Sequence, residues 1–382
     1  MAASEQDTEL ALFRDSVRRF VKERVAPFYE EWERAGIIPR ETWRELGAAG
    51  MLGTDIPLEY GGNGADFRFS VAVQQEIARA GFLALACNIT VHSDICAHYV
   101  LNAGTEEQKR RYLPKMVSGD CVGAIAMTEP GAGSDLQSIR ASAQPDGDGW
   151  KINGAKTFIT NGQHADLVIT AARTDTSAPG SKGISLLLVD ADAPGFARGR
   201  NLEKLGLHAA DTSELFYSDV RVGREALLGG LHRGFSVLMN ELPRERLGLS
   251  IGAVAHARGA LDITVAYVKE RQAFGQALAA HQNTRYRLAE MAAAITVHER
   301  FLDSCIASLM RRELDTATAS IAKLSCTELE DQVVDGCLQL FGGYGYMREY
   351  PISRFYADSR VQRIYGGTSE IMKELISRDV LK

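Results

Sequence analysis

A carboxylate and an arginine stand side by side in the segment Leu242-Pro-Arg-Glu-Arg246, and such a pair could remove a proton from a substrate. The segment also has the pattern of a helix start, because Pro243 suits the first helical position and a Glu two residues later complements the helix dipole. Carboxylates in first turns are common and catalytic ones are rare. Taken alone, Glu245 is therefore expected to be structural, and Arg246 to be an ion partner or a solvated charge.

Two glycine segments could bind a ligand through their backbone. Tyr365-Gly-Gly-Thr-Ser-Glu-Ile371 places a glycine turn before Thr368 or Ser369, either of which can cap a helix, so its N–H groups could hold an anion or a carbonyl oxygen. Phe341-Gly-Gly-Tyr-Gly-Tyr346 could let a ligand approach a helix end. An ordinary helix cap is the simpler explanation of the first segment and explains the second equally well.

A third glycine cluster, Thr128-Glu-Pro-Gly-Ala-Gly-Ser-Asp135, has only part of a dinucleotide fingerprint. Its third glycine is absent and a strand is expected to follow, so a β-turn cluster is favoured over phosphate or cofactor binding. The sequence has no G-x-x-x-x-G-K-[ST] or H-E-x-x-H motif, and its eight His never pair at zinc-ligand spacing. We therefore expect no metal site and no P-loop.

Three regions of different texture must position these segments, which predicts a multidomain α+β fold. The first region has apolar residues at helical spacing, and we expect helices that begin near residue 8 and then span 41–49, 69–80 and 106–118. In the second, β-prone runs alternate with turn residues, and we expect strands at 123–127, 151–160, 167–170, 184–189 and 215–222. The third has long apolar stripes and no proline between Arg244 and Tyr350, which predicts a helical bundle. The predicted domains are helical (1–120), β-barrel or sandwich (121–232) and helical bundle (233–382).

The composition excludes several classes of protein. The chain has 382 residues, and 43 Lys plus Arg against 49 Asp plus Glu give a formal charge of -6, so neither nucleic acid nor an anionic membrane is an expected partner. The six Cys are scattered without C-x-x-C spacing and are expected to be reduced. Met1 to Leu10 lacks the pattern of a secretory signal, and no stretch has 18 uninterrupted apolar residues. We expect a cytoplasmic protein, or a mitochondrial matrix protein if the source is eukaryotic.

Read together and in order, the segments resemble the acyl-CoA dehydrogenase family over nearly the whole chain. The resemblance is carried by Ala126-Met-Thr-Glu-Pro-Gly-Ala-Gly-Ser-Asp135, Thr157-Phe-Ile-Thr-Asn-Gly162, Arg271-Gln-Ala-Phe-Gly275, Gln339-Leu-Phe-Gly-Gly343 and Tyr365-Gly-Gly-Thr368. Within the family, Leu205–Phe216, Glu241–Leu247 and Tyr365–Ile376 look most like the long-chain type and its bacterial counterparts. The implied fold is a helical N-terminal domain, a middle β domain and a C-terminal four-helix bundle.

The resemblance implies an activity, a cofactor and partners. The activity is α,β-dehydrogenation of an acyl-CoA thioester to the trans-2-enoyl-CoA, of medium to long chain, with FAD as hydride acceptor. Electrons would pass to an electron-transfer flavoprotein. FAD would lie between the β domain, the bundle and a neighbouring subunit of a homotetramer built as a pair of dimers.

The resemblance also implies where FAD would be held. Met127, Thr128 and Ser134 would line the flavin, and Phe158 and Thr160 would bracket its ring, with Phe158 in place of the Trp of many members. A second group would reach the pyrophosphate and ADP part from the adjoining subunit: Arg271, Phe274, Gln282, Gln339, Gly342 and Gly343. Ala273 stands where some members have a Thr hydroxyl. Thr368 and Glu370 would close the site beside the flavin.

The base departs from the commonest family pattern. Many members carry it as a Glu directly after the Tyr of the Tyr-x-Gly-Thr segment, and here that position is Gly366. Long-chain and isovaleryl-type members place it on the bundle helix, where this chain has Glu245, so the resemblance makes Glu245 the preferred base and Arg246 the residue that fixes the geometry around it. The backbone N–H of Gly366 could donate to the thioester oxygen. Substrate contacts are expected from Ser134, Arg246, Tyr365 and Gly367.

Three alternatives stay open from the sequence. A same-fold acyl-CoA oxidase or flavin monooxygenase would let the reduced flavin meet oxygen. A short branched-chain, isovaleryl-like dehydrogenase would share the position of the base. A catalytically silent scaffold would be favoured if both base positions had lost their carboxylate, and Glu245 speaks against it.

Overall fold

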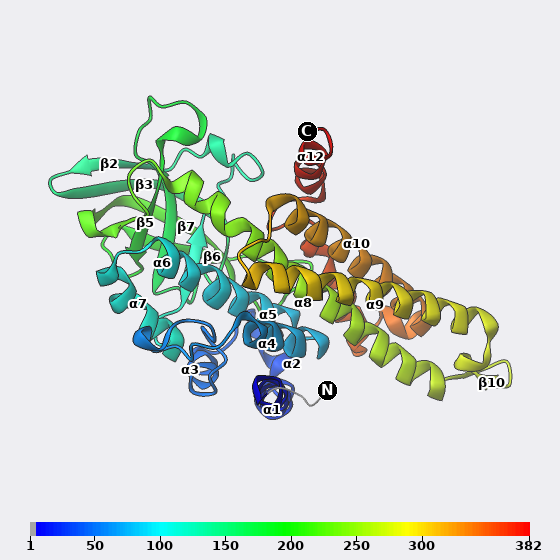
Figure 1. Ribbon diagram of the computed structural model, residues 1–382. Helices are drawn as coiled ribbons and strands as arrows, with labels where there is room; N and C mark the ends of the chain where they lie inside the picture. Colours follow the sequence, from blue (N-terminus) through cyan, green and yellow to red (C-terminus); the bar gives the residue numbers. More distant parts are fainter. Residues whose placement is uncertain (1–4) are drawn as a thin grey trace.

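The computed structural model describes residues 5–382, in which helices and a sheet occupy separate stretches of the chain (Figure 1). The first third is helical, and two of its turns, Val21–Val25 and Thr90–Cys96, are π-helical. Its α-helices are α1 (Glu5–Phe20), α2 (Tyr29–Ala35), α3 (Arg40–Ala48), α4 (Phe67–Arg79), α5 (Leu83–Ile89), α6 (Ala97–Ala103) and α7 (Glu106–Ser118). No helix in the described part of the chain is long and apolar enough to cross a membrane.

Local sequence signals explain where these helices begin and end. The Asp66 side chain caps α4 by accepting a hydrogen bond from the backbone N–H of Arg68. Thr105 and Gln108 form a reciprocal capping box at the start of α7, and Gly119 ends that helix in the left-handed conformation. The helices expected at 41–49, 69–80 and 106–118 are therefore present.

The middle third forms one mixed sheet of eight strands. Its order is β6-β7-β3-β2-β4-β5-β8, with β1 parallel to β4. The strands are β1 (Gly123–Ala126), β2 (Ser142–Asp146), β3 (Gly149–Thr160), β4 (Leu167–Arg173), β5 (Ile184–Asp190), β6 (Phe196–Asn201), β7 (Thr212–Gly223) and β8 (Leu227–Leu228). All five expected strands are present. The sequence did not predict β2, β6 or β8, because β2 contains Pro145, β6 is a largely exposed polar edge and β8 has only two residues.

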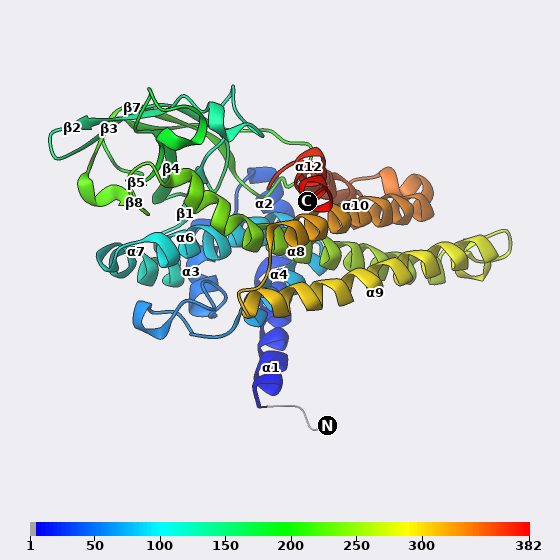
Figure 2. The ribbon, with the colours of Figure 1, turned by 45° about the horizontal axis from the view of Figure 1, so that its top comes forward.

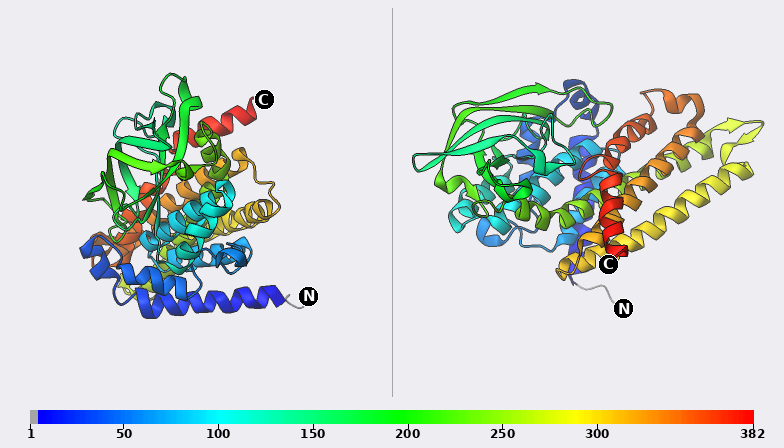
Figure 3. Two further views of the ribbon diagram at one scale, coloured as in Figure 1. Left: turned by 90° about the vertical axis from the view of Figure 1, so that its left-hand side faces the viewer. Right: turned by 90° about the horizontal axis from the view of Figure 1, so that it is seen from above.

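The last third is a bundle whose long helices extend away from the sheet (Figure 2). Leu247, Ile251 and Val254 of the first helix pack with Ile295 and Val333 of the next two in one apolar core. The helices are α8 (Gly234–Glu270), α9 (Gln282–Met310), α10 (Thr316–Phe341), α11 (Pro351–Ser359) and α12 (Ser369–Val380), and the hairpin β9 (Gln272–Ala273) with β10 (Gln276–Ala277) joins α8 to α9. Seen from above, α12 lies between the sheet and the far end of the bundle (Figure 3).

The predicted helix start at Pro243 is wrong. Helix α8 begins at Gly234 and runs for 37 residues, with Pro243 in its interior. Proline removes the N–H that would bond the carbonyl of Met239. The helix continues upstream because Leu238 is buried and Phe235 packs beside it in the core beneath the sheet. Glu245 is therefore far from the helix N-terminus, and the macrodipole does not explain its presence.

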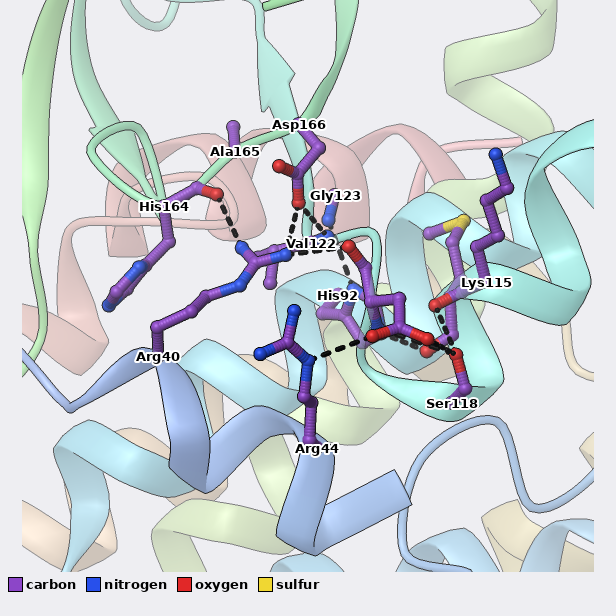
Figure 4. Close-up of polar contacts among 12 residues, drawn as sticks. Arg40, Arg44, His92, Lys115, Ser118, Val122, Gly123, His164, Ala165 and Asp166 are labelled. Atoms are coloured by element: carbon purple, nitrogen blue, oxygen red, sulfur yellow. Dashed lines mark hydrogen bonds and ion pairs between the residues drawn. The ribbon is translucent and has the colours of Figure 1, made fainter. Parts of the chain in front are cut away.

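Arg40 of α3 ties the N-terminal helices to the sheet (Figure 4). Its guanidinium donates to the carbonyl oxygens of His164, at 2.9 Å, and Asp120, at 2.7 Å, and pairs with Asp166 at 2.5 Å. Asp166 also accepts a hydrogen bond of 2.7 Å from the backbone N–H of Val122, at the entry to β1. The sheet is thus fixed against α3 at the point where the helical region ends.

His92 makes a second, buried connection at the same junction (Figure 4). Its Nδ1 accepts from the backbone N–H of Gly123 at 3.0 Å, so its Nε2 carries the proton and donates to the carbonyl of Met116 at 2.9 Å. Burial lowers the pKa of His92 to about 4. The ring therefore stays neutral and keeps this tautomer at physiological pH.

Candidate active site

Glu245 lies inside the protein, where helices α6 and α8 meet. Its side chain is buried, and Oε1 accepts a hydrogen bond of 2.7 Å from the hydroxyl of Tyr99 on α6. Tyr99 is itself completely buried. The hydrogen bond fixes one oxygen of the carboxylate and leaves the other free to accept a proton.

Burial raises the pKa of Glu245 from 4.5 to about 7, because the interior disfavours the charged form. The hydrogen bond from Tyr99 and the positive charge of Arg246 oppose this rise, and the nearby Glu241 adds to it. A carboxyl group with a pKa near neutrality exchanges protons readily at the pH of the cell. Glu245 is thus suited to the role of general base, which the sequence alone did not favour.

The glycine turn before α12 packs against the same face of α8. Gly366 and Gly367 have φ angles of +64° and +100°, which other residues rarely adopt. A Cβ on Gly366 would lie 2.3 Å from Cδ1 of Leu249, and a Cβ on Gly367 would lie 3.9 Å from Nη2 of Arg246. Leu249 stands one helical turn after Glu245. The structure therefore brings both base positions, 245 and 366, to one region.

Arg246 is buried beside this turn and has capacity for further hydrogen bonds. Its Nη1 donates to the hydroxyl of Ser320 at 3.4 Å, and its Nε has no partner among the described residues. Burial lowers its pKa, and the neighbouring charge of Glu245 opposes that effect. A buried guanidinium with unused donors can hold an anionic or carbonyl group of a ligand.

The remaining residues of the turn have defined local roles. Thr368 is the N-cap of α12, with Oγ1 accepting from the N–H of Ile371 at 3.4 Å, so the cap falls on Thr368 and not on Ser369. The hydroxyl of Tyr365 donates to Oε1 of Gln362 at 2.8 Å and thus points into the core. Glu370 is exposed, and hydrogen bonds to its own backbone and to Thr368 lower its pKa.

A buried ion pair holds the segment Met127–Thr128 against β3. The ammonium group of Lys156 lies 2.8 Å from Oε1 of Glu129 and donates to the carbonyl of Met127 at 3.0 Å. The N–H of Thr157 donates to the carbonyl of Thr128 at 2.9 Å. Met127, Thr128, Phe158 and Thr160 are thus neighbours, whereas Ser134 lies exposed on the turn that follows Glu129.

Phe158 is an unusual residue in a strand. Its φ is +59°, a conformation that is strained for a bulky side chain, and its ring is 68% exposed. The pairing of β3 with β7 is interrupted between Lys156 and Ile159, and the extra residue turns the ring outward. A strained, exposed aromatic ring beside polar groups fits a flat aromatic ligand that would cover it.

A second group of expected residues meets at the far end of the bundle. Arg271, Gln339, Gly342 and Gly343 line a cavity of about 470 Å³. The guanidinium carbon of Arg271 lies 5.2 Å from the ring centre of Tyr344. A Cβ on Gly342 or Gly343 would meet no atom within 4 Å, so a ligand can approach this backbone. A cation, an amide and open backbone are groups that bind phosphates.

Two further members of this group lie close by and are exposed. Phe274, at the turn of the β9–β10 hairpin, is 97% exposed and has a φ of +51°. Gln282 donates to the hydroxyl of Tyr286 at 2.5 Å on the surface of α9. A fully exposed phenyl ring in a left-handed turn is the expected state of a residue that packs on another molecule.

Within one chain, the residues expected to hold the flavin and those expected to hold the pyrophosphate lie far apart. Phe158 and Thr160 belong to β3, and the hairpin that carries Phe274 lies at the opposite end of the molecule (Figures 1 and 2). The family resemblance implies this division, since it places Arg271 and Phe274 at a neighbour's cofactor.

Three features of the site were not predicted from the sequence. Leu249 could have been found, because it follows Glu245 by four residues on the same helical face. Tyr99 comes from a helical stretch without any motif, and only the packing of α6 on α8 brings it to Glu245. The pair of Lys156 and Glu129 joins residues 27 positions apart, at no recognisable spacing.

Sequence profiles of known families match almost the whole chain. The profiles described as "Acyl-CoA dehydrogenase, N-terminal domain", "middle domain" and "C-terminal domain" match residues 7–120, 124–220 and 232–381. The chain is 47% identical to the long-chain specific acyl-CoA dehydrogenase, mitochondrial, of Sus scrofa, over 98% of this chain and 87% of the relative.

Solved structures give the same result. An acyl-CoA dehydrogenase from Geobacillus kaustophilus superposes with a TM-score of 0.95 at 45% identity, over 99% of this chain and 98% of that chain. A glutaryl-CoA dehydrogenase from Mycobacterium smegmatis in complex with FADH2 superposes with a TM-score of 0.91 at 30% identity, over 97% of this chain and 94% of that chain.

Proposed function

This chain belongs to the acyl-CoA dehydrogenase family, and we propose that Glu245 is the base with which it removes the α-proton of an acyl-CoA thioester. The protein is an FAD-dependent oxidoreductase that dehydrogenates acyl-CoA. The observation that carries the proposal for Glu245 is its position: a buried carboxyl group with a pKa near 7, one helical turn from the residue that packs on Gly366.

In this reaction the residues of the chain hold the substrate and move one proton. The deprotonated Glu245 takes the α-proton on its free oxygen while the Tyr99 hydroxyl keeps the other oxygen in place. Arg246 maintains positive charge beside the base, and the N–H of Gly366 would donate to the thioester oxygen, where negative charge develops. FAD, when bound, supplies the acceptor for the hydride that leaves the β-carbon.

The residues present fit FAD in two separate places. The exposed ring of Phe158, with Thr160, Met127 and Thr128, suits the flat isoalloxazine ring, and Ser134 is near enough in sequence to contribute. The cavity with Arg271, Gln339, Gly342 and Gly343 suits the pyrophosphate, with Phe274 and Gln282 around it. Thr368 and Glu370 would close the flavin end.

Because these places are at opposite ends of one chain, we propose that two chains complete each FAD site, in a homotetramer arranged as a pair of dimers. An electron-transfer flavoprotein would receive the electrons. We also propose domain boundaries after residues 120 and 232, and a cytoplasmic or mitochondrial matrix location. Ser134, Arg246, Tyr365 and Gly367 are proposed to contact the substrate. Of these, Tyr365 would do so through its backbone, since its hydroxyl is bonded to Gln362.

The proposal is tested by mixing the yellow holoenzyme anaerobically with saturated acyl-CoA thioesters of graded length and with isovaleryl-CoA. Rapid bleaching of the flavin by a straight-chain substrate, followed by slow reoxidation in air, is the expected result. Fast reoxidation by oxygen would indicate an oxidase instead, and a preference for isovaleryl-CoA would indicate the branched-chain alternative. No bleaching by any thioester would overturn the proposal.

A further inference from the structure

Lys323 of α10 is buried directly behind the glycine turn. Its side chain is completely inaccessible to solvent, which is rare for lysine. The ammonium group donates a hydrogen bond of 2.6 Å to the carbonyl oxygen of Gly367. Lys323 is not among the residues proposed to act in the reaction or to hold FAD.

The turn has few other means of holding its shape. Gly366 and Gly367 are both in left-handed conformations and have no side chains to pack. Leu249 and Arg246 of α8 limit the turn on one side, and Cε of Met372 would lie 2.6 Å from a Cβ on Gly367. These are steric limits, so the bond from Lys323 is the directional contact that sets the orientation of the peptide group between Gly367 and Thr368, and it thereby anchors the end of the turn that carries the Gly366 N–H.

The surroundings of Lys323 do not favour its charge. Burial and, to a smaller extent, the charge of the neighbouring Arg246 lower its pKa to about 8, and the charge of Glu370 opposes both. A lysine in such a place costs stability unless its hydrogen bond compensates. Among the described residues, the bond to Gly367 is the only hydrogen bond of its ammonium group.

We propose that Lys323 is a positioning residue for the proposed dehydrogenation: by fixing the Gly367 carbonyl, it aligns the Gly366 N–H with the thioester oxygen opposite Glu245. The inference rests on the proposed function of the turn. Because the turn meets both α8 and α12, a small displacement there changes the distance between substrate and base. Misplacement by about 1 Å is known to reduce catalytic rates roughly 100-fold.

The test compares Lys323→Met with Lys373→Met in the FAD-loaded enzyme. Lys373 lies on α12, its side chain is 60% exposed, and its ammonium group lies 3.8 Å from Glu328. Lys373→Met therefore serves as a control that removes one lysine near the turn without removing the contact with Gly367. We expect Lys323→Met to retain FAD and to lower kcat by roughly 10- to 100-fold with KM changed much less. Hydrogen exchange in a peptide spanning 362–372 should become several-fold faster, while Lys373→Met resembles wild type.

Unchanged kcat together with unchanged exchange in 362–372 would overturn the inference. If Lys323→Met does not fold, Lys323→Gln keeps a polar side chain whose donor is one atom shorter than that of lysine and does not reach the Gly367 carbonyl, so it must show the faster exchange with normal FAD content. The exchange measurement does not depend on acyl-CoA chemistry. Failure of wild-type flavin to bleach therefore counts against the proposed function, and normal exchange in the variants counts against Lys323.

Discussion

Two buried glutamates of the bundle, Glu245 on α8 and Glu330 on α10, are similar in charge and different in surroundings. Burial raises the pKa of both carboxyl groups, to about 7 for Glu245 and well above its usual value for Glu330. Oε1 of Glu330 lies 2.7 Å from Nδ1 of His256, and the His256 ring stacks on Phe355 with centroids 4.3 Å apart. Both members of this second pair are completely inaccessible to solvent.

The comparison shows that a perturbed pKa does not by itself identify a base. Burial lowers the pKa of His256 to about 3, so the pair of Glu330 and His256 is neutral and shares one proton within the core. Glu245 has instead a hydroxyl donor on one side and the glycine turn with Arg246 on the other. What distinguishes the two is access to a place where a substrate could be held.

Replacing either glutamate by glutamine should give the largest difference in activity between the two positions. Glu245→Gln keeps the shape of the side chain and cannot accept the α-proton, so anaerobic flavin reduction by acyl-CoA should fall on the order of 100- to 10,000-fold with FAD retained. Glu330→Gln should stay within a few-fold of wild type, because the amide N–H can still donate to His256. Wild-type reduction in Glu245→Gln would place the base elsewhere.

Glu245→Gln, which should lower activity, should raise the stability of the folded protein above neutral pH. Since the folded pKa of about 7 exceeds the usual 4.5, the folded protein binds more protons between these values, and its free energy of unfolding decreases as pH rises through that window. At pH 8 the loss is about 3 kcal/mol. Glu245→Gln should remove this loss of stability. The Tm of the variant should therefore exceed the wild-type Tm at pH 8, and the two Tm values should converge near pH 4.5. An equal pH dependence of Tm in both proteins would contradict the raised pKa.

Loss of the Glu330 carboxyl group should mainly destabilise the fold. Glu330→Leu leaves His256 without its partner in the core, which costs on the order of 1–3 kcal/mol. Chemical denaturation of the holoenzyme should detect this decrease, while kcat per bound FAD changes little. A large loss of kcat at unchanged stability would assign Glu330 to the reaction.

In a protein that lacks the carboxylate of Glu245, moving the base to the turn requires both Gly366→Glu and a smaller residue at position 249. Gly366→Glu alone should impair folding or FAD binding, because its Cβ would meet Leu249 at 2.3 Å and its φ is +64°. In the background of Glu245→Gln, Leu249→Ala together with Gly366→Glu should restore flavin reduction about tenfold over Glu245→Gln, a gain of about 1.4 kcal/mol. No recovery in a folded, yellow triple variant would mean that the two positions do not reach the same α-carbon.

The smallest expected effects are shifts of the pH profile. Tyr99→Phe removes a hydrogen bond that favours the carboxylate, so the acidic limb of kcat/KM, near pH 7, should move to higher pH. Glu241→Gln removes a neighbouring negative charge and should move it to lower pH. Each shift should be on the order of half a pKa unit to one unit. Shifts in the same direction in both variants would show that another group titrates.

The sequence predicted the fold and the site to different extents. The strand at 184–189 carries a local signal in its run of β-prone residues, the helix at 106–118 carries one in its capping residues, and both elements are present. The start of α8 was missed because the signal of Pro243 is local, whereas the helix continues through burial of Leu238. Glu245 was identified through family resemblance. Its partner Tyr99 and the contact of Leu249 with Gly366 depend on tertiary packing, which no spacing in the sequence records.

The contact between Leu249 and Gly366 also restricts how the position of the base can change in evolution. A carboxylate at position 366 requires the Leu249 side chain to move or to become smaller, because its Cβ would lie 2.3 Å from Cδ1 of Leu249, and the φ of +64° is strained for any residue with a side chain. Positions 245, 249 and 366 are therefore coupled, and a base on α8 is separated from a base on the turn by more than one substitution.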